Sequence, residues 1–146
     1  MTEAAWSTEL SLLQSRGVTL KPGLTVAEIQ RVEELHRFRF PPDLRSFLSC
    51  ALPIGPKFPG GPTSFPDWRS PESVQEQLDW LFEGIAFDIE HAAFWWEPWG
   101  PRPAALSDAI AVARAAVDLA PRLIPIMGHR YLPAEPEVEG LSLIHI

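Results

Sequence analysis

Residues 24–50, which read LTVAEIQRVEELHRFRFPPDLRSFLSC, contain the clearest folding signals of the chain. Thr25 and Glu28 are spaced as a capping box, in which each side chain accepts a hydrogen bond from the backbone amide of the other residue. This pair predicts a helix that begins directly after Thr25. The apolar residues that follow at helical spacing are Ile29, Val32 and Leu35.

Four further helices are predicted around this segment. Pro41 and Pro42 interrupt the chain and open a helix that ends near Cys50, because proline is tolerated in the first helical turn. An N-terminal helix is predicted from Trp6 to Gly17. The two later helices begin at Ser70 and at Leu106, and we expect them to end at Gly84 and at Pro121.

The sheet is expected to begin after Gly84. Ile85, Phe87 and Ile89 alternate with polar or small residues, which is typical of a half-buried strand, and residues 94–96 could form another strand after a turn. Residues 123–127 predict a strand that turns at Gly128 and His129 into a partner at 130–132. Pro125 lacks an amide proton, so this strand is expected at an edge or with a bulge.

The element order predicts a single α+β domain over residues 1–140, with about five helices packed on a mostly antiparallel sheet. Eight of the sixteen prolines fall between Pro41 and Pro71, so residues 52–66 are expected to form a stiffened loop that packs on the domain. Residues 141–146 (LSLIHI) match the translation of a transposon end used in sequencing adapters. We therefore expect this tail to be foreign and the native chain to be truncated after Gly140.

Composition restricts the function. Nineteen acidic and twelve basic residues give a net charge of −7, which disfavours nucleic acid and anionic membranes and suits a basic partner. Cys50 is the only cysteine, so no internal disulfide can form, and the absence of a leader-like or membrane-spanning segment predicts a cytoplasmic protein. No phosphate-binding glycine loop occurs, and no cofactor is expected.

The densest chemical information lies in residues 84–103, which contain half of the six tryptophans. Trp95 is expected to fill the core, whereas Trp96 and Trp99 could equally serve the core or a partner contact. Asp88, Glu90 and His91 could be imagined as an acid–base or metal site, but carboxylates on the outer face of a strand explain them more simply. The chain is therefore predicted to be neither an enzyme nor a metal protein.

The sequence resembles the SUKH superfamily, specifically its Smi/Knr-like branch, named for a fungal cell-wall assembly regulator and common in bacteria. The resemblance covers nearly the whole chain and rests on residues 24–29 (LTVAEI), 40–45 (FPPDLR), 65–69 (FPDWR), 84–88 (GIAFD), 99–103 (WGPRP) and 122–133 (RLIPIMGHRYLP). It implies an α+β fold with helices on one side of a mostly antiparallel sheet. It also implies a non-catalytic role, either as an immunity protein that neutralises a toxin or as a regulatory scaffold.

These features together predict a protein-binding module. The alternative is a small-ligand or carbohydrate binder that uses exposed tryptophans as stacking platforms. The residues predicted to contact the partner are Trp68, Arg69, Trp96, Trp99, His129 and Arg130.

Overall fold

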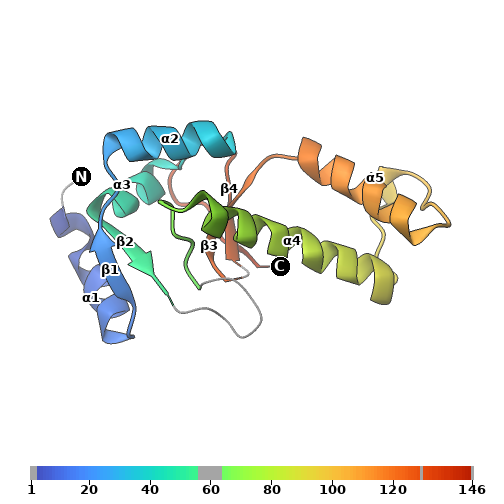
Figure 1. Cartoon of the computed structure of the whole chain (residues 1–146). Helices are drawn as coiled ribbons and strands as arrows, with labels where there is room; N and C mark the ends of the chain where they lie inside the picture. Colours follow the sequence, from blue (N-terminus) through green and yellow to red (C-terminus); the bar gives the residue numbers. More distant parts are fainter. Residues whose placement is uncertain (1–2, 56–63, 129, 146) are drawn as a thin grey trace.

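The computed structural model describes residues 3–55, 64–128 and 130–145, and it has the predicted α+β fold. Helices and strands are coloured along the chain in Figure 1. The α-helices are α1 (Ser7–Ser15), α2 (Val26–His36), α3 (Pro42–Cys50), α4 (Pro71–His91) and α5 (Leu106–Leu119), and two short 3-10 helices are η1 (Glu3–Trp6) and η2 (Glu97–Trp99). The strands are β1 (Thr19–Pro22), β2 (Ala51–Ile54), β3 (Leu123–Met127), β4 (Arg130–Pro133) and β5 (Ile144–His145).

The strands form two small antiparallel sheets instead of one continuous sheet. One contains β1 and β2, and the other has the order β3-β4-β5. Pro125 lies in the edge strand β3, where the register with β4 shifts between Pro125 and Met127, so the prediction of an edge strand with an irregularity is confirmed. Strand β2 begins at Ala51 and includes the first three residues, 52–54, of the segment that was expected to be loop; among the described residues it pairs with β1 alone. Most of the rest of that loop, residues 56–63, and the turn residue His129 lie outside the described residues.

The capping box at α2 forms as the sequence predicts. The amide of Glu28 donates to Thr25 Oγ1 at 3.2 Å, and the amide of Thr25 donates to Glu28 Oε2 at 2.8 Å. The helix ends at His36, and the next residue, Arg37, caps it in a left-handed conformation with φ 59°. Its buried residues Ile29 and Val32 therefore point as a pair into the domain.

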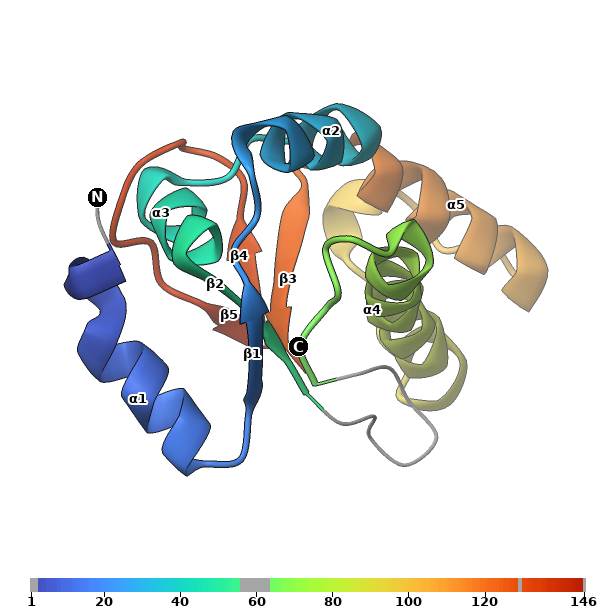
Figure 2. The ribbon, with the colours of Figure 1, turned by 60° about the vertical axis from the view of Figure 1, so that its left-hand side comes forward.

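The main core is enclosed by α2, α3, both sheets and the first turns of α4, which surround it in Figure 2. Aromatic rings fill its centre: Phe40 is fully buried and lies edge-on to Trp68, with ring centroids 5.0 Å apart. Other fully or nearly buried members are Leu24, Leu48, Leu52, Val74, Ile124 and Leu132. Burial of this set provides the dominant stabilisation of the domain.

Helix α4 corrects two of our predictions. Gly84 does not end the helix, and residues 85–90 are not a strand, because α4 continues without a break for 21 residues to His91. Ile85 and Ile89 are four residues apart and so share one helical face, while Phe87 projects away and is 60% exposed. The predicted strand at residues 94–96 is also wrong: these residues form no regular structure and lead into η2.

Because α4 is about 30 Å long, it extends well past the main core. We call residues 84–119, which comprise the end of α4, η2 and α5, the arm (Figure 1). A second core of Ile89, Ala109 and Ala113 holds α4 to α5. The two alanines let the helices approach closely at this level. The arm therefore has its own small packing centre beside the main core.

Within the described residues, no helix is long and apolar enough to cross a membrane. At the C-terminal end, Leu141 packs against the main core, and the amide of Gly140 donates to Asp43 Oδ2 at 3.0 Å. The foreign origin of residues 141–146 stays a prediction.

Candidate functional site

An aromatic cluster lies where α4 turns into η2. We define it as Phe94, Trp95, Trp96 and Trp99. Trp99 is its centre, and the other three rings meet the Trp99 ring edge-on, at centroid distances of 5.9, 5.2 and 5.9 Å and interplanar angles of 89°, 79° and 83°. Each such edge-to-face pair stabilises by about 0.5–1.5 kcal/mol beyond its area burial, so the rings hold one another in place.

Local backbone geometry places the cluster. Asp88 O accepts from the amides of both Ala92 and Phe94, and Ala93 adopts a left-handed conformation with φ 54°, so the chain turns sharply off the helix. Gly100 then has φ 89°, and its carbonyl oxygen accepts a 2.8 Å hydrogen bond from Trp95 Nε1. The aromatic residues are thus held on a short turn that is closed by hydrogen bonds.

The cluster has a buried side and an exposed side. Trp95 and Trp99 are half-buried against the second core, so Trp95 packs on a core as expected but does not fill it. Trp96 is 55% exposed and Phe94 is 42% exposed. Among the described residues, Trp96 is the only one of the six tryptophans that is exposed. The cluster therefore presents a rigid apolar surface to solvent.

The arm is acidic in sequence. Residues 84–119 contain five carboxylates, namely Asp88, Glu90, Glu97, Asp108 and Asp118, and two arginines, Arg102 and Arg114. Arg102 donates a hydrogen bond to Ile89 O at 3.1 Å. Five acids less two arginines give the arm a net charge of −3, out of −7 for the chain.

The helical course of α4 also separates the acid–base candidates. Two residues apart on a strand, Asp88 and Glu90 would share a face, but on a helix they point in different directions. Both are exposed, and His91 Nε2 lies 3.5 Å from Glu90 Oε2 on the outer surface. In the part of the chain that the structure describes, no group of three or more potential metal ligands comes together.

Trp68 does not offer its ring to a partner, which corrects its place among the predicted contact residues. Only 5% of it is exposed, and its ring packs edge-on against Phe40, Phe38 and His36 at centroid distances of 5.0, 5.9 and 6.3 Å. Trp68 is thus a core residue.

Arg69 is likewise occupied by internal contacts. Its Nε and Nη2 donate to the two carboxylate oxygens of Glu28 at 2.9 and 3.2 Å, and its two Nη groups also donate to Pro22 O and Gly23 O at 2.9 Å. These hydrogen bonds tie the segment before α4 to the start of α2 and the end of β1. The same guanidinium lowers the pKa of Glu28 to about 2.

Of the five predicted contact residues that the structure describes, only Trp96 and Trp99 belong to the aromatic cluster. Arg130 is exposed on β4, a strand of the main body, and His129 lies outside the described residues. The sequence indicated the aromatic cluster correctly but not that Phe94 belongs to its exposed surface. The burial of Trp68 and the hydrogen bonding of Arg69 depend on contacts with residues about 30 and 41 positions away, which no local pattern reveals.

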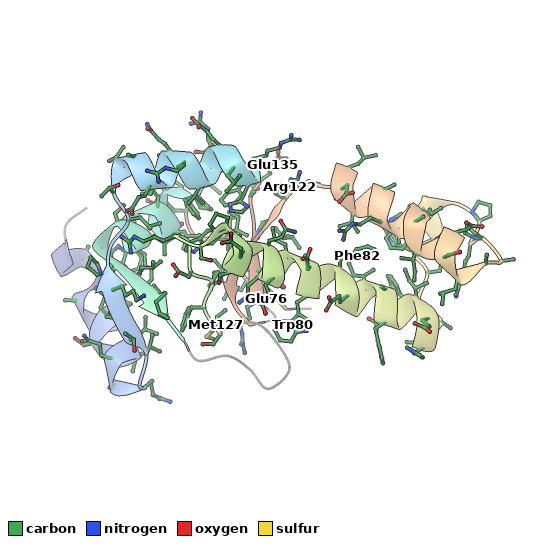
Figure 3. The ribbon with its side chains drawn as sticks, viewed as in Figure 1. Glu76, Trp80, Phe82, Arg122, Met127 and Glu135 are labelled. Carbon is green, nitrogen blue, oxygen red and sulfur yellow. The ribbon has the colours of Figure 1, made fainter. Side chains whose placement is uncertain are left out.

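The structure also contains a cleft of about 280 Å³ that no sequence pattern indicated, at the base of the arm between α4 and α5. Its walls are mainly apolar, with Phe82 projecting from the side of α4 that faces α5 and Arg122 at the rim near the end of α2 (Figure 3). His36 forms part of the wall, and burial lowers the pKa of its imidazole. All of the α4 residues that line the cleft except Ile85 come before Gly84, so it is the packing of α5 beside α4 that the sequence did not reveal.

No protein-family model matches this sequence, and comparisons with curated proteins and with solved structures likewise give no match. The resemblance to the SUKH superfamily accordingly stays a prediction.

Proposed function

We propose that this chain is a non-catalytic protein-binding module of the Smi/Knr-like SUKH type, acting in the cytoplasm as an immunity protein or a regulatory scaffold. The observation that carries the proposal is the exposed ring of Trp96, held edge-on by Trp99 at 5.9 Å on the surface of the arm. Binding energy in protein interfaces concentrates on rigid aromatic anchors, of which tryptophan is the most enriched. An anchor that is already ordered loses little conformational entropy on binding.

The charge around Trp96 supports a basic partner. Five carboxylates and two arginines in residues 84–119 give the arm that carries Trp96 a net charge of −3 and therefore a negative field. Such a field accelerates encounter with a positive surface and disfavours nucleic acid or an anionic membrane. A basic toxin is the partner that this surface suits best.

The test uses the gene neighbourhood of the native host. The product of an adjacent large, toxin-like reading frame is co-expressed with this chain, and both complex formation and rescue of growth are measured. We expect a stable complex whose affinity falls as the salt concentration rises. We expect Trp96→Ala to lower the affinity at least tenfold, which corresponds to a loss of about 1.4 kcal/mol or more and is typical of a hot-spot residue. Leu119→Ala is the matched control, because Leu119 is the most exposed apolar side chain of α5 and lies at the other end of that helix.

Two results would contradict the proposal. A complex that Trp96→Ala leaves unchanged would place the interface elsewhere on the molecule. If no toxin-like neighbour forms a complex, the immunity role is abandoned, and the regulatory role stands only if a basic host protein binds wild type but not Trp96→Ala.

A second candidate function is a small-ligand or carbohydrate binder that uses the same exposed tryptophan as a stacking platform. We rank it lower because Trp96 alone among the described tryptophans is exposed, which gives a ligand one ring to stack on. Saturable quenching of tryptophan fluorescence by a soluble glycan, absent in Trp96→Phe, would favour this function over protein binding.

A further inference from the structure

The cleft at the base of the arm has the form of a small-molecule site. The apolar wall comes from the half-buried residues Leu78, Phe82 and Ile85 of α4, and Val117 of α5 faces them. These side chains are only half-buried because no described side chain fills the space between the helices at this level. Ligand sites in proteins are typically concave, mostly apolar and bordered by a few polar groups, with volumes from about 300 Å³ upward, so this cleft is of the size that takes a small ligand.

Two arginines border this apolar space. The guanidinium carbon of Arg114 lies 4.4 Å from the centroid of the Phe82 ring, so the ring supports the cation at the edge of the cleft. Arg122 borders the cleft in the segment between α5 and β3. Among the described residues, neither guanidinium has a carboxylate within ion-pair distance or a side-chain hydrogen bond. By contrast, Arg45 and Arg69 each have a carboxylate partner.

The N–H donors of a guanidinium lie in its plane and match the two oxygens of a carboxylate. We propose that the cleft binds a small amphipathic monocarboxylate, with its apolar chain between α4 and α5 and its carboxylate on Arg114 and Arg122. This inference goes beyond the proposed protein-binding function, because none of the aromatic cluster lines the cleft.

Two aspartates also line the cleft, and their charge helps to distinguish a carboxylate ligand from an amine ligand. Asp79 Oδ1 already accepts a 2.9 Å hydrogen bond from the side-chain amide nitrogen Nε2 of Gln75. Asp118 lies four residues from each arginine in the sequence and forms no ion pair with either. Its negative charge opposes a bound carboxylate and would favour a bound amine. Removal of this charge therefore has opposite effects on the two kinds of ligand.

The experiment is calorimetric titration of the purified chain with three probes of equal chain length: decanoate, 1-decanol and decylamine. We expect saturable binding of decanoate, with 1-decanol and decylamine each at least tenfold weaker, since a hydrogen bond to a charged partner contributes about tenfold or more in affinity. Arg114→Gln and Arg122→Gln should each weaken decanoate about tenfold and leave 1-decanol unchanged. Arg114→Lys should restore only part of the affinity, because an ammonium group lacks the planar pair of donors.

Three further variants locate the site. Val117→Trp fills the cleft and should abolish binding of all three probes, with melting measured by circular dichroism to show that the variant is folded. Asp118→Asn should strengthen decanoate and weaken decylamine. Arg16→Gln, a change at an exposed arginine that lies outside the cleft, should have no effect.

The proposal is overturned if decanoate shows no saturable binding, if decylamine binds as tightly as decanoate, or if folded Val117→Trp binds decanoate like wild type. Equal affinity of wild type and both glutamine variants would also overturn it. Trp96→Ala should leave decanoate binding intact, so failure of this site and failure of the protein-binding surface are distinguishable.

Discussion

Replacement of Gly84 by alanine tests the continuity of α4, on which the arm depends. Gly84 lies in the interior of the helix and is exposed, and a Cβ built on its backbone would meet no atom within 4 Å. Alanine therefore fits without strain and lowers the backbone entropy of the unfolded chain. We expect Gly84→Ala to stabilise the protein.

The magnitude follows from helix propensity. Glycine in a helix interior is about 0.8–1.0 kcal/mol less favourable than alanine. With a denaturant slope of roughly 1–3 kcal/mol per molar urea, a gain of about 1 kcal/mol raises the urea midpoint by about 0.3–1 M. The assay is urea denaturation followed by far-ultraviolet circular dichroism, which reports on helix content directly.

Gly100 provides the matched control with the opposite sign. Its added Cβ would also meet no atom within 4 Å, but its φ of 89° is a conformation that side-chain-bearing residues rarely adopt. Gly100→Ala should therefore destabilise by about 1–3 kcal/mol, because φ 89° with ψ −170° is a region that almost only glycine occupies. A midpoint for Gly84→Ala equal to or below that of wild type would refute the continuous helix and would favour the break that the sequence predicted at this glycine.

Three other predictions concern the packing and ionisation of the domain. Trp68→Ala should destabilise by about 3–5 kcal/mol in urea denaturation, the range for a fully buried large aromatic, and a loss below about 1 kcal/mol would contradict its place in the core. Because Arg69 lowers the pKa of Glu28 from 4.5 to about 2, the ionised carboxylate stabilises the fold above pH 4.5, and this stabilisation is lost as the pH falls from 4.5 toward 2. At pH 4.5 the melting temperature of Glu28→Gln should be lower than that of wild type, and it should fall less between pH 4.5 and 2. If the melting temperatures of the two proteins fall in parallel, the carboxylate does not stabilise the fold in this way. Burial lowers the pKa of His36 below 6.5, so the contribution of the neutral imidazole to the stability of the fold is fully present above pH 6.5 and is lost as the pH falls below that value. Thermal melts of His36→Gln should not show this loss of stability. If the variant loses the same stability as wild type, another group is responsible.

The elements that the sequence predicted best are those decided by neighbouring residues. The start of α2 depends on Thr25 and Glu28, three positions apart, and both hydrogen bonds of the box form. The edge strand β3 depends on the missing amide proton of Pro125, and it lies at the edge with a register shift. In such cases the local chemistry and the tertiary structure favour the same conformation, so tertiary contacts have nothing to override.

The second half of α4 is different because its local pattern is ambiguous. Ile85, Phe87 and Ile89 satisfy a period of two, yet Ile85 and Ile89 also satisfy the four-residue spacing of a helix. Contacts with Ala109 and Ala113, about 20 residues further along the chain, decide between them, since two small residues let α5 pack closely against Ile89. No pattern within residues 84–91 contains that information.

The same long-range effect determines which conspicuous residues are free to act. Trp68 and Arg69 resemble a recognition pair in the sequence, but the first is buried against Phe40 and the second donates four hydrogen bonds to Glu28 and to the backbone of β1 and the residue after it. Their contacts thus hold the start of α4 against the main core. Once α4 is fixed there and continues to His91, its far end must be covered by α5, and the turn between the helices carries Trp96 outward. The continuity of one helix accounts for the exposed aromatic surface, and the divergence of the two helices toward the main core accounts for the cleft.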